Sequence, residues 1–306
     1  MALTRRYFIG SAAAAVAGAL TPRRVWSGTS LAMGGIQIDT LSDGNLVLPG
    51  SFALGDTPVA DAAPILAKYG LGTDRLEPPC NVTLLRDGTN TVLFDVGSGP
   101  DFQPTAGKLM DAFDALGISP GDVTHVVFTH GHPDHIWGLL DDFDDPMFPD
   151  ATHMMGKAEF DYWMDDATVD TIDPGRTTFA VGAKRRLEAI EDAITTFEDG
   201  AEILPGVAAR GTFGHTPGHM SFHVQAGSDS AMIVGDAIVN HHLAFERPEW
   251  HAGSDQDPPR GAETRVRLLD QIASEQMRLI GFHLPQGGIG RAEGASGRYR
   301  FVPEGM

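Results

Sequence analysis

The spacing of apolar and polar residues predicts strands intermixed with helices along most of the chain. Residues 35–39 alternate apolar and polar side chains, which is typical of a strand with one buried face. Two apolar runs, 81–85 and 91–94, flank a turn signal at Asp87 and Gly88 and predict a β-hairpin. Similar runs predict further strands at residues 125–129, 201–204, 207–211, 221–224, 232–234 and 279–283.

Apolar residues at helical spacing predict helices at residues 62–69, 109–116, 157–164, 184–194 and 264–277. Asp43 and Gly44 predict a turn after the first strand. This order of elements favours an α/β sandwich with mixed sheets over a doubly wound parallel sheet. No glycine-rich phosphate-binding loop follows a predicted strand, so the sequence does not indicate a nucleotide cofactor.

The first 33 residues have the pattern of an export signal and its linker. Arg5 and Arg6 precede an aromatic residue, an aliphatic residue and an alanine-rich apolar run that ends at Leu20. The run is too short to span a bilayer as a helix, so we expect no stable membrane anchor. The arginine pair resembles a twin-arginine signal, which predicts export through the Tat machinery to the periplasm or the medium. Residues 34–306 are then expected to form one domain.

Composition narrows the classes of partner and of metal site. Acidic residues outnumber basic ones by 41 to 22, which gives a net charge of −19. Such a surface repels phosphate backbones and anionic lipid, so nucleic acid is not an expected partner. The acidity either favours a small neutral or cationic substrate or serves to keep an exported protein soluble. Cys80 is the single cysteine, which excludes zinc sites built from two or four cysteines.

Three histidines and an aspartate are crowded into six residues directly after a predicted strand. A buried cluster of such polar groups needs partners, and imidazole nitrogen and carboxylate oxygen are ligands of divalent metals at about 2.0–2.2 Å. In an extended turn, His130 and His132 point to one side, whereas Asp134 and His135 point to a second position nearby. This block therefore predicts two metals rather than one.

Three later segments present the same ligand types at predicted turns and strand ends. His215 lies in a glycine- and proline-containing turn, Asp236 ends the apolar run at 232–234, and His283 ends the run at 279–283. In this order, the H-x-H-x-D-H block, the H-T-P-G-H turn, the Gly-Asp strand end and the late histidine resemble the metallo-β-lactamase-fold hydrolase superfamily. The similarity extends over most of residues 36–302.

The resemblance implies an αββα sandwich, in which two mixed β-sheets are flanked by helices and the site lies at one edge of both sheets. It implies that two divalent cations are bound, with zinc favoured and manganese, cobalt or iron as alternatives. The implied ligands are His130, His132 and His215 for one cation and Asp134, His135 and His283 for the other, with Asp236 bridging both. Asp134 is expected to have a second, catalytic role: to orient the nucleophile or to pass a proton to the leaving group. A homodimer is one of the oligomeric states left open.

Four further features have roles that the sequence describes less fully. The turn from Asp95 to Gly97 resembles the family's D-x-G turn and either supports a ligand or simply ends a strand. His219 is expected to orient the His215 turn through a hydrogen bond. The loop at 237–259 forms either part of a substrate wall or a surface loop. Cys80 is expected to be a small buried apolar residue without a catalytic role.

The ligand set predicts hydrolysis by a hydroxide held between two metals, acting on a neutral ester-like bond: a lactone, a carboxylic ester or a phosphotriester. Asp236 stands where β-lactamases of the cysteine-ligand type carry cysteine, which disfavours antibiotic hydrolysis. Val239 stands where quorum-quenching lactonases often carry tyrosine, which weakens that assignment. The C-terminal segment from Phe282 looks like the exported branch that includes methyl parathion hydrolase. Two alternatives remain: a mononuclear-iron persulfide dioxygenase of the same fold and a non-catalytic metal-binding module.

Overall fold

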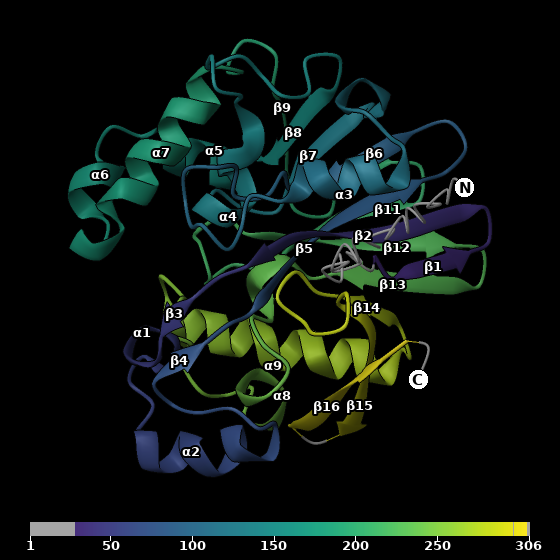
Figure 1. The fold of residues 1–306 in the computed structure, drawn as a ribbon. Coiled ribbons are helices and arrows are strands. Elements are labelled where there is room, and N and C mark those ends of the chain that lie inside the picture. The colour runs from purple at the N-terminus through teal and green to yellow at the C-terminus, as the bar shows by residue number, and fades with distance from the viewer. Residues whose placement is uncertain (1–27, 296, 305–306) are drawn as a thin grey trace, which may run out of the picture.

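Two mixed β-sheets lie at the centre of the structure, a computed structural model that describes residues 28–295 and 297–304 (Figure 1). In the first sheet, β6 to β9 are parallel and the other neighbouring strands are antiparallel. Its strand order is β1 (Ser30–Met33), β2 (Ile36–Asn45), β5 (Pro79–Arg86), β6 (Thr91–Phe94), β7 (His125–Phe128), β8 (Thr152–Gly156) and β9 (Thr195–Phe197).

The second sheet contains one parallel pair, β13 with β14, among antiparallel neighbours. Its strand order is β10 (Glu202–Leu204), β11 (Val207–Gly211), β12 (Met220–Ala226), β13 (Asp229–Ile233), β14 (Arg278–Ile280), β15 (Ile289–Ala295) and β16 (Arg298–Pro303). The short strands β3 (Leu48–Pro49) and β4 (Arg75–Leu76) form a separate pair.

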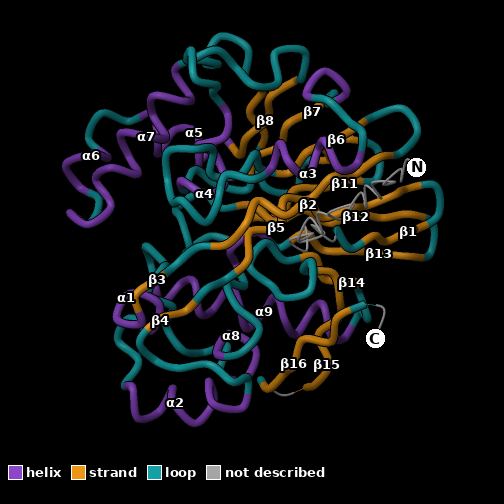
Figure 2. Tube along the Cα trace, in the orientation of Figure 1, coloured by secondary structure: helices purple, strands orange, loops and turns teal. Residues whose placement is uncertain are grey.

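Helices cover the outer faces of both sheets, as the purple and orange segments of Figure 2 show. The first sheet is covered by α3 (Leu109–Leu116), α4 (Pro133–Ile136), α5 (Lys157–Met164), α6 (Thr168–Thr171) and α7 (Thr177–Glu188). The second is covered by α8 (Leu243–Glu246) and α9 (Pro258–Ser274). Helices α1 (Gly50–Leu54) and α2 (Val59–Lys68) pack with α8 beside the site.

Three apolar layers follow from the alternation of side chains along the strands. Leu85 in β5 packs between the sheets, whereas its neighbour Leu84 faces the helices of the first sheet. Phe94 and Phe222 meet across the two sheets with ring centroids 5.0 Å apart. Met232 in β13 faces the α9 layer. This arrangement confirms the predicted α/β sandwich of two mixed sheets flanked by helices.

Several predicted elements differ from the structure in position. The segment Ser30–Met33, assigned to the linker, forms β1 and pairs with β2. The predicted turn at Asp43 and Gly44 lies inside β2, where the register shifts between Ser42 and Gly44. The Asp43 side chain is buried and accepts a hydrogen bond from the Leu109 N–H at 2.9 Å, so it fixes the start of α3 rather than a hairpin.

Other differences concern element ends and strands that the sequence analysis did not predict. The helix predicted at 184–194 is α7, which begins at Thr177 and ends at Glu188. Strand β14 ends at Ile280, so His283 lies three residues beyond the strand. Strands β8, β9, β15 and β16 were not predicted. Most of the predicted signal segment lies outside the described residues, and within them no helix is both long and apolar enough to cross a membrane.

Candidate metal centre

The seven predicted ligand side chains are buried together at one edge of the two sheets. The first sheet supplies four of them: His130 and His132 from the loop after β7, and Asp134 and His135 from the short helix α4. The second sheet supplies the other three, which are His215 in the β11–β12 turn, Asp236 after β13 and His283 after β14. Residues far apart in the sequence therefore meet at a single site.

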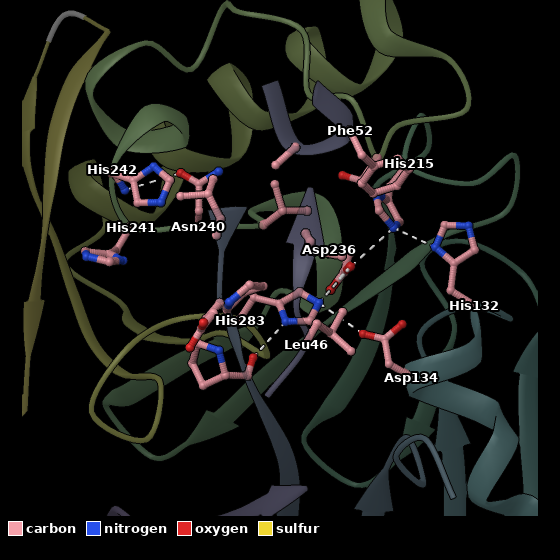
Figure 3. A pocket seen from close by; sticks show the side chains of 18 of the residues that line it. Leu46, Phe52, His132, Asp134, His215, Asp236, Asn240, His241, His242 and His283 are labelled. Carbon is pink, nitrogen blue, oxygen red and sulfur yellow. Dashed lines mark hydrogen bonds and ion pairs between the residues drawn. The ribbon is translucent and has the colours of Figure 1, made fainter. Parts of the chain in front are cut away.

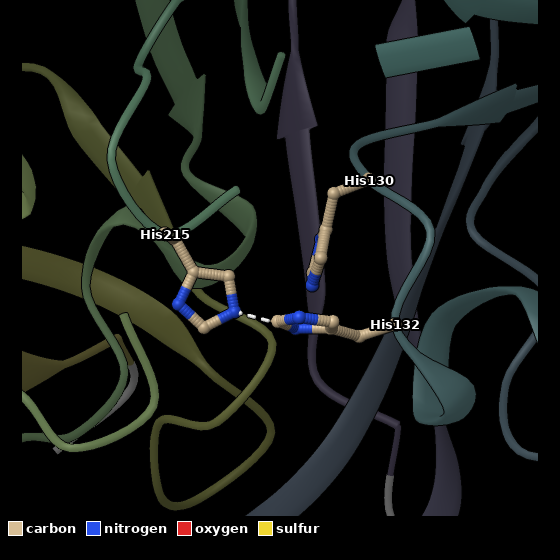
Figure 4. Close-up of side chains that lie close together, drawn as sticks. All are labelled: His130, His132 and His215. Atoms are coloured by element: carbon tan, nitrogen blue, oxygen red, sulfur yellow. Dashed lines mark hydrogen bonds between the residues drawn. The ribbon is translucent and has the colours of Figure 1, made fainter. Parts of the chain in front are cut away.

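Three imidazoles form the first group, and Figure 4 shows their rings converging. One nitrogen atom from each of His130, His132 and His215 lies within 4.8 Å of the other two. The closest pair is His132 Nδ1 and His215 Nε2, at 2.9 Å. This is the set of residues expected to hold the first cation.

The second group surrounds the Asp236 carboxylate, and Figure 3 shows two of its members, Asp134 and His283, beside Asp236. Its Oδ1 atom lies 3.3 Å from His135 Nε2, and its Oδ2 atom lies 3.3 Å from His283 Nε2. The same Oδ2 atom lies 3.2 Å from His215 Nε2 in the first group. Asp134 Oδ2 lies 3.2 Å from His283 Nε2 and 3.5 Å from His135 Nε2. Asp236 thus occupies the position between the two groups that a bridging ligand requires.

The donor atoms have the spacing and the unmet bonding capacity of a cation site. Ligand atoms about 2.1 Å from one tetrahedral cation lie about 3.4 Å apart, close to the separations around Asp236. Four of the buried atoms of this site make no hydrogen bond: His130 Nε2, Asp134 Oδ2, His135 Nε2 and Asp236 Oδ1. Because unpaired buried polar atoms are costly, the residues fit divalent metal ions better than they fit an empty core.

Electrostatics holds the second group together. Burial alone lowers the pKa of His135 and of His283, but the nearby carboxylates, Asp236 foremost, outweigh it and raise both pKa values well above the usual range. Burial likewise tends to raise the pKa of Asp236, and the imidazoles of His283, His135 and His215 instead bring it well below the usual range. Since metal ligands must be deprotonated, a cation here competes with protons for the same nitrogen atoms.

The second nitrogen atom of each ring is held by a partner outside the two groups. His135 Nδ1 lies 2.8 Å from Asp95 Oδ2, and His215 Nδ1 lies 3.0 Å from Asp255 Oδ1. His283 Nδ1 donates to the Pro79 carbonyl at 2.7 Å. Such contacts fix which nitrogen atom faces the centre and how the ring is oriented.

The turn beginning at Asp95 supports a ligand rather than only ending a strand. The carboxylate of Asp95 also accepts hydrogen bonds from the N–H and the hydroxyl of Thr129, both at 2.8 Å. His219 was expected to orient the His215 turn. Its Nδ1 atom lies 2.8 Å from the hydroxyl of Thr212, which begins that turn, and its Nε2 atom accepts from the Asp236 N–H at 3.0 Å, a contact that was not predicted. The hydrogen bonds of Asp95 and His219 therefore position segments that carry proposed ligands.

Glu159 in α5 ties together two of those segments and was missed by the sequence analysis. Its buried carboxylate accepts from the N–H groups of Gly131 and Gly218, each at 2.9 Å. It also accepts from the Thr216 hydroxyl at 2.7 Å and from Trp163 Nε1 at 2.6 Å. The approach is so close that a Cβ atom on Gly218 would lie 2.1 Å from the Glu159 backbone nitrogen. The sequence did offer one signal for this role, because Glu159 is a charged residue on the buried side of the helix predicted at 157–164.

Asp255 and Gln256, also missed, come from the loop predicted at 237–259. Asp255 contacts His215, and Gln256 Nε2 lies 3.3 Å from His132 Nε2. Two buried arginines hold this segment in place. Arg176 donates to the carbonyls of Gly253 and Ser254 at 2.8 Å each, and Arg265 donates to the Trp250 carbonyl at 2.6 Å. Hydrogen bonds from these arginines therefore hold the loop in position as part of the site.

A cavity of about 220 Å³ opens onto both ligand groups. One side of its wall comes from the 237–259 loop, including Val239, Asn240, His241 and His242, which agrees with the substrate-wall interpretation. The other side comes from segments that the sequence analysis did not place at the site. Its apolar residues include Leu46, Leu48, Phe52, Leu76, Phe102 and Phe179.

Comparison of the sequence with known protein families finds a match over most of the chain. The model of the metallo-beta-lactamase superfamily matches residues 76–283. Metallo-beta-lactamase domain-containing protein 1 of Xenopus laevis is 39% identical over 208 residues, which cover 65% of this chain and 70% of that protein. N-acyl homoserine lactonase AttM of Agrobacterium fabrum is 29% identical over 134 residues, covering 41% of this chain and 44% of that protein.

Two solved structures are similar over nearly the whole chain. Hydrolase AbOPH, of the beta-lactamase superfamily, has a TM-score of 0.85 at 27% identity and covers 93% of this chain and 99% of its own. AidC, a dizinc quorum-quenching lactonase, has a TM-score of 0.85 at 23% identity and covers 91% of this chain and 98% of its own. Because the identity with AidC is this low, the similarity shows only that the two proteins share a fold.

Proposed function

Because the chain belongs to the metallo-β-lactamase superfamily, we propose that it is a hydrolase that binds two divalent cations and cleaves a neutral ester-like bond. The candidate bonds are those of a lactone, a carboxylic ester or a phosphotriester. Zinc is the favoured metal, because it is commonly bound by imidazoles and carboxylates; AidC, which has the same fold, is a dizinc enzyme.

The observation that carries this proposal is the position of Asp236 between two groups of buried ligands. One carboxylate contacts His215 of the first group and both His135 and His283 of the second. Two cations sharing this carboxylate would supply a nucleophile from water at neutral pH and stabilise the charge that develops on the attacked oxygen. The mononuclear alternative leaves the second group without a purpose.

Asp134 is the residue proposed to move a proton. It lines the cavity as well as contacting His283, so its carboxylate faces the place where a substrate lies. From there it can orient the attacking water or pass a proton to the leaving group.

The cavity wall supports a neutral substrate. Apart from the proposed cation ligands, Glu77 is an acidic residue on the cavity wall, and its charge would repel an anionic substrate. Arg176 also lines it, but its guanidinium is engaged by the carbonyls of Gly253 and Ser254. Apolar side chains such as Phe52 and Phe179 offer contact to an acyl or aryl group.

Metal analysis beside an activity panel tests the proposal. Protein purified with its resident metal is assayed against a lactone, an aryl ester and a phosphotriester, and its metal content is measured by elemental analysis. We expect close to two metal ions per chain and turnover of at least one substrate that is lost on chelation and restored by metal. Absence of turnover on all three, with two metals bound, favours the non-catalytic module. A single iron per chain together with oxygen consumption favours the dioxygenase.

A further inference from the structure

Cys80 lies beside the second ligand group, although the sequence analysis gave it only a packing role. It belongs to β5, its side chain is fully buried, and it is the single cysteine of the chain. Its Sγ atom, a carboxylate oxygen of Asp134 and a ring nitrogen of His283 all lie within 4.8 Å of one another. The three residues come from β5, α4 and the segment after β14.

Two independent observations link this cluster to a cation. Asp134 Oδ2 is buried and has no hydrogen-bond partner, so one donor of the cluster has unmet bonding capacity. The His283 ring is tied through Nδ1 to the carbonyl of Pro79, the residue that precedes Cys80. This bond fixes the His283 ring against the start of β5, so the sulfur and the ring are held in one arrangement.

We propose that Cys80 Sγ is a ligand of the second cation, together with Asp134 and His283. The inference rests on the proposed two-cation function. The coordination step balances simply: the thiol releases its proton to solvent as the sulfur–metal bond forms, and no oxidant or reductant takes part. A metal–sulfur bond of about 2.3 Å is longer than a bond to nitrogen, so the sulfur can stand slightly farther from the centre than the imidazoles.

A sulfur ligand changes what the second site selects. Burial raises the pKa of Cys80 to about 12, so without a cation the group stays a neutral thiol. A thiolate formed on metal binding is a soft donor, which favours zinc or cobalt over magnesium or manganese. The two cation sites would then differ in chemistry, since the described ligands of the first group are imidazoles and Asp236.

Because the chain has a single cysteine, a thiolate–metal signal must come from Cys80. The full-length protein is loaded with Co²⁺, and its near-ultraviolet spectrum is recorded together with the cobalt content per chain. The same is done for Cys80→Ser, which removes the sulfur, and for Cys80→Val, which keeps an apolar side chain of similar size in case serine disturbs folding.

We expect two cobalt ions per chain and a sulfur-to-cobalt charge-transfer band that both variants lack. The variants should bind the second ion at least roughly 10-fold more weakly, because the loss of a residue that only orients a ligand already costs that much. Two cobalt ions without the band overturn the role of Cys80 and leave the two-cation site intact. One cobalt ion without the band overturns both. One cobalt ion with the band supports the sulfur ligand and overturns the two-cation proposal.

Discussion

Replacement of Glu159 by glutamine tests how the two ligand-bearing segments are held. Glu159 Oε1 accepts from the Gly131 N–H and from Trp163 Nε1, while Oε2 accepts from the Thr216 hydroxyl and the Gly218 N–H. Glutamine has the same shape, but one acceptor oxygen becomes an NH₂ donor. The variant therefore removes acceptor capacity at a buried site without creating a cavity.

The two orientations of the new amide differ in cost. With NH₂ in the Oε1 position, Gly131 and Trp163 would both lose an acceptor. With NH₂ in the Oε2 position, the Thr216 hydroxyl can rotate and accept, so only the Gly218 N–H is left unpaired. The second orientation is favoured, and one unpaired buried N–H costs about 1–3 kcal/mol. If the turn shifts to give this N–H a new partner, His215, three residues earlier in the same turn, would move with it.

The expected effect therefore appears in metal affinity at the first cation site. If cation binding must reverse the shift, 1–3 kcal/mol corresponds to a loss of roughly 5- to 150-fold. Competition with a chelator of known affinity measures the metal affinity. The free energy of unfolding of the metal-free protein is measured in parallel with denaturant.

Asp39→Asn is the matched control, because Asp39 is also a buried carboxylate but is bonded to Ser30, Gln37 and Arg86, away from the site. The control should lose stability and keep its metal affinity. If Glu159→Gln behaves like the control, with wild-type affinity and only lowered stability, the positioning argument is refuted.

Three other predictions concern separate parts of the chain. Asp236→Ala should remove bound metal and activity together, because its carboxylate contacts both ligand groups; two retained metals with full turnover would show that it does not bridge. Burial, aided by His241, lowers the pKa of His242 to about 3 from 6.5, so the unfolded chain binds one more proton between those values. Stability should thus fall as pH falls from 6.5 toward 3, by about 2 kcal/mol at pH 5, and denaturation of His242→Asn should depend less on pH; equal slopes would contradict this. Changing Arg5 and Arg6 to lysine should block the proposed export of the full chain, and normal accumulation outside the cytoplasm would count against a twin-arginine signal.

The ligand cluster could be predicted from the sequence because its chemistry is local. His130, His132, Asp134 and His135 form one short block, and the other ligands stand at turns or at the ends of apolar runs that pattern alone reveals. The structure places all of them together, while their role as ligands remains a prediction. The fold followed from the order of strands and helices, since layers form wherever apolar faces must be buried.

The supporting residues could not be predicted, because their roles exist only after folding. Glu159 looks like an ordinary helix residue until α5 packs against the loops at Gly131 and Gly218. Strand β8 was missed because, as a buried parallel strand, it lacks the alternation that marks a half-exposed one. Strands β15 and β16 carry glycines and arginines that obscure their pattern.

The division of ligands between the sheets gives the site a structural consequence. Each group takes residues from both sheets: His130 and His132 lie with His215 in one, and Asp134 contacts His135 and His283 in the other. A bound cation therefore joins the same edge of the two sheets, and folding and metal binding share free energy, about 2.7 kcal/mol at a metal concentration of 100 times Kd. Without a cation, the carboxylates of Asp134 and Asp236 lie beside the imidazoles of His135 and His283, whose pKa values they raise. The hydrogen bonds that Asp95, Asp255, Glu159 and Pro79 accept would keep the proposed ligands in position before a metal binds, which would lower the cost of binding it.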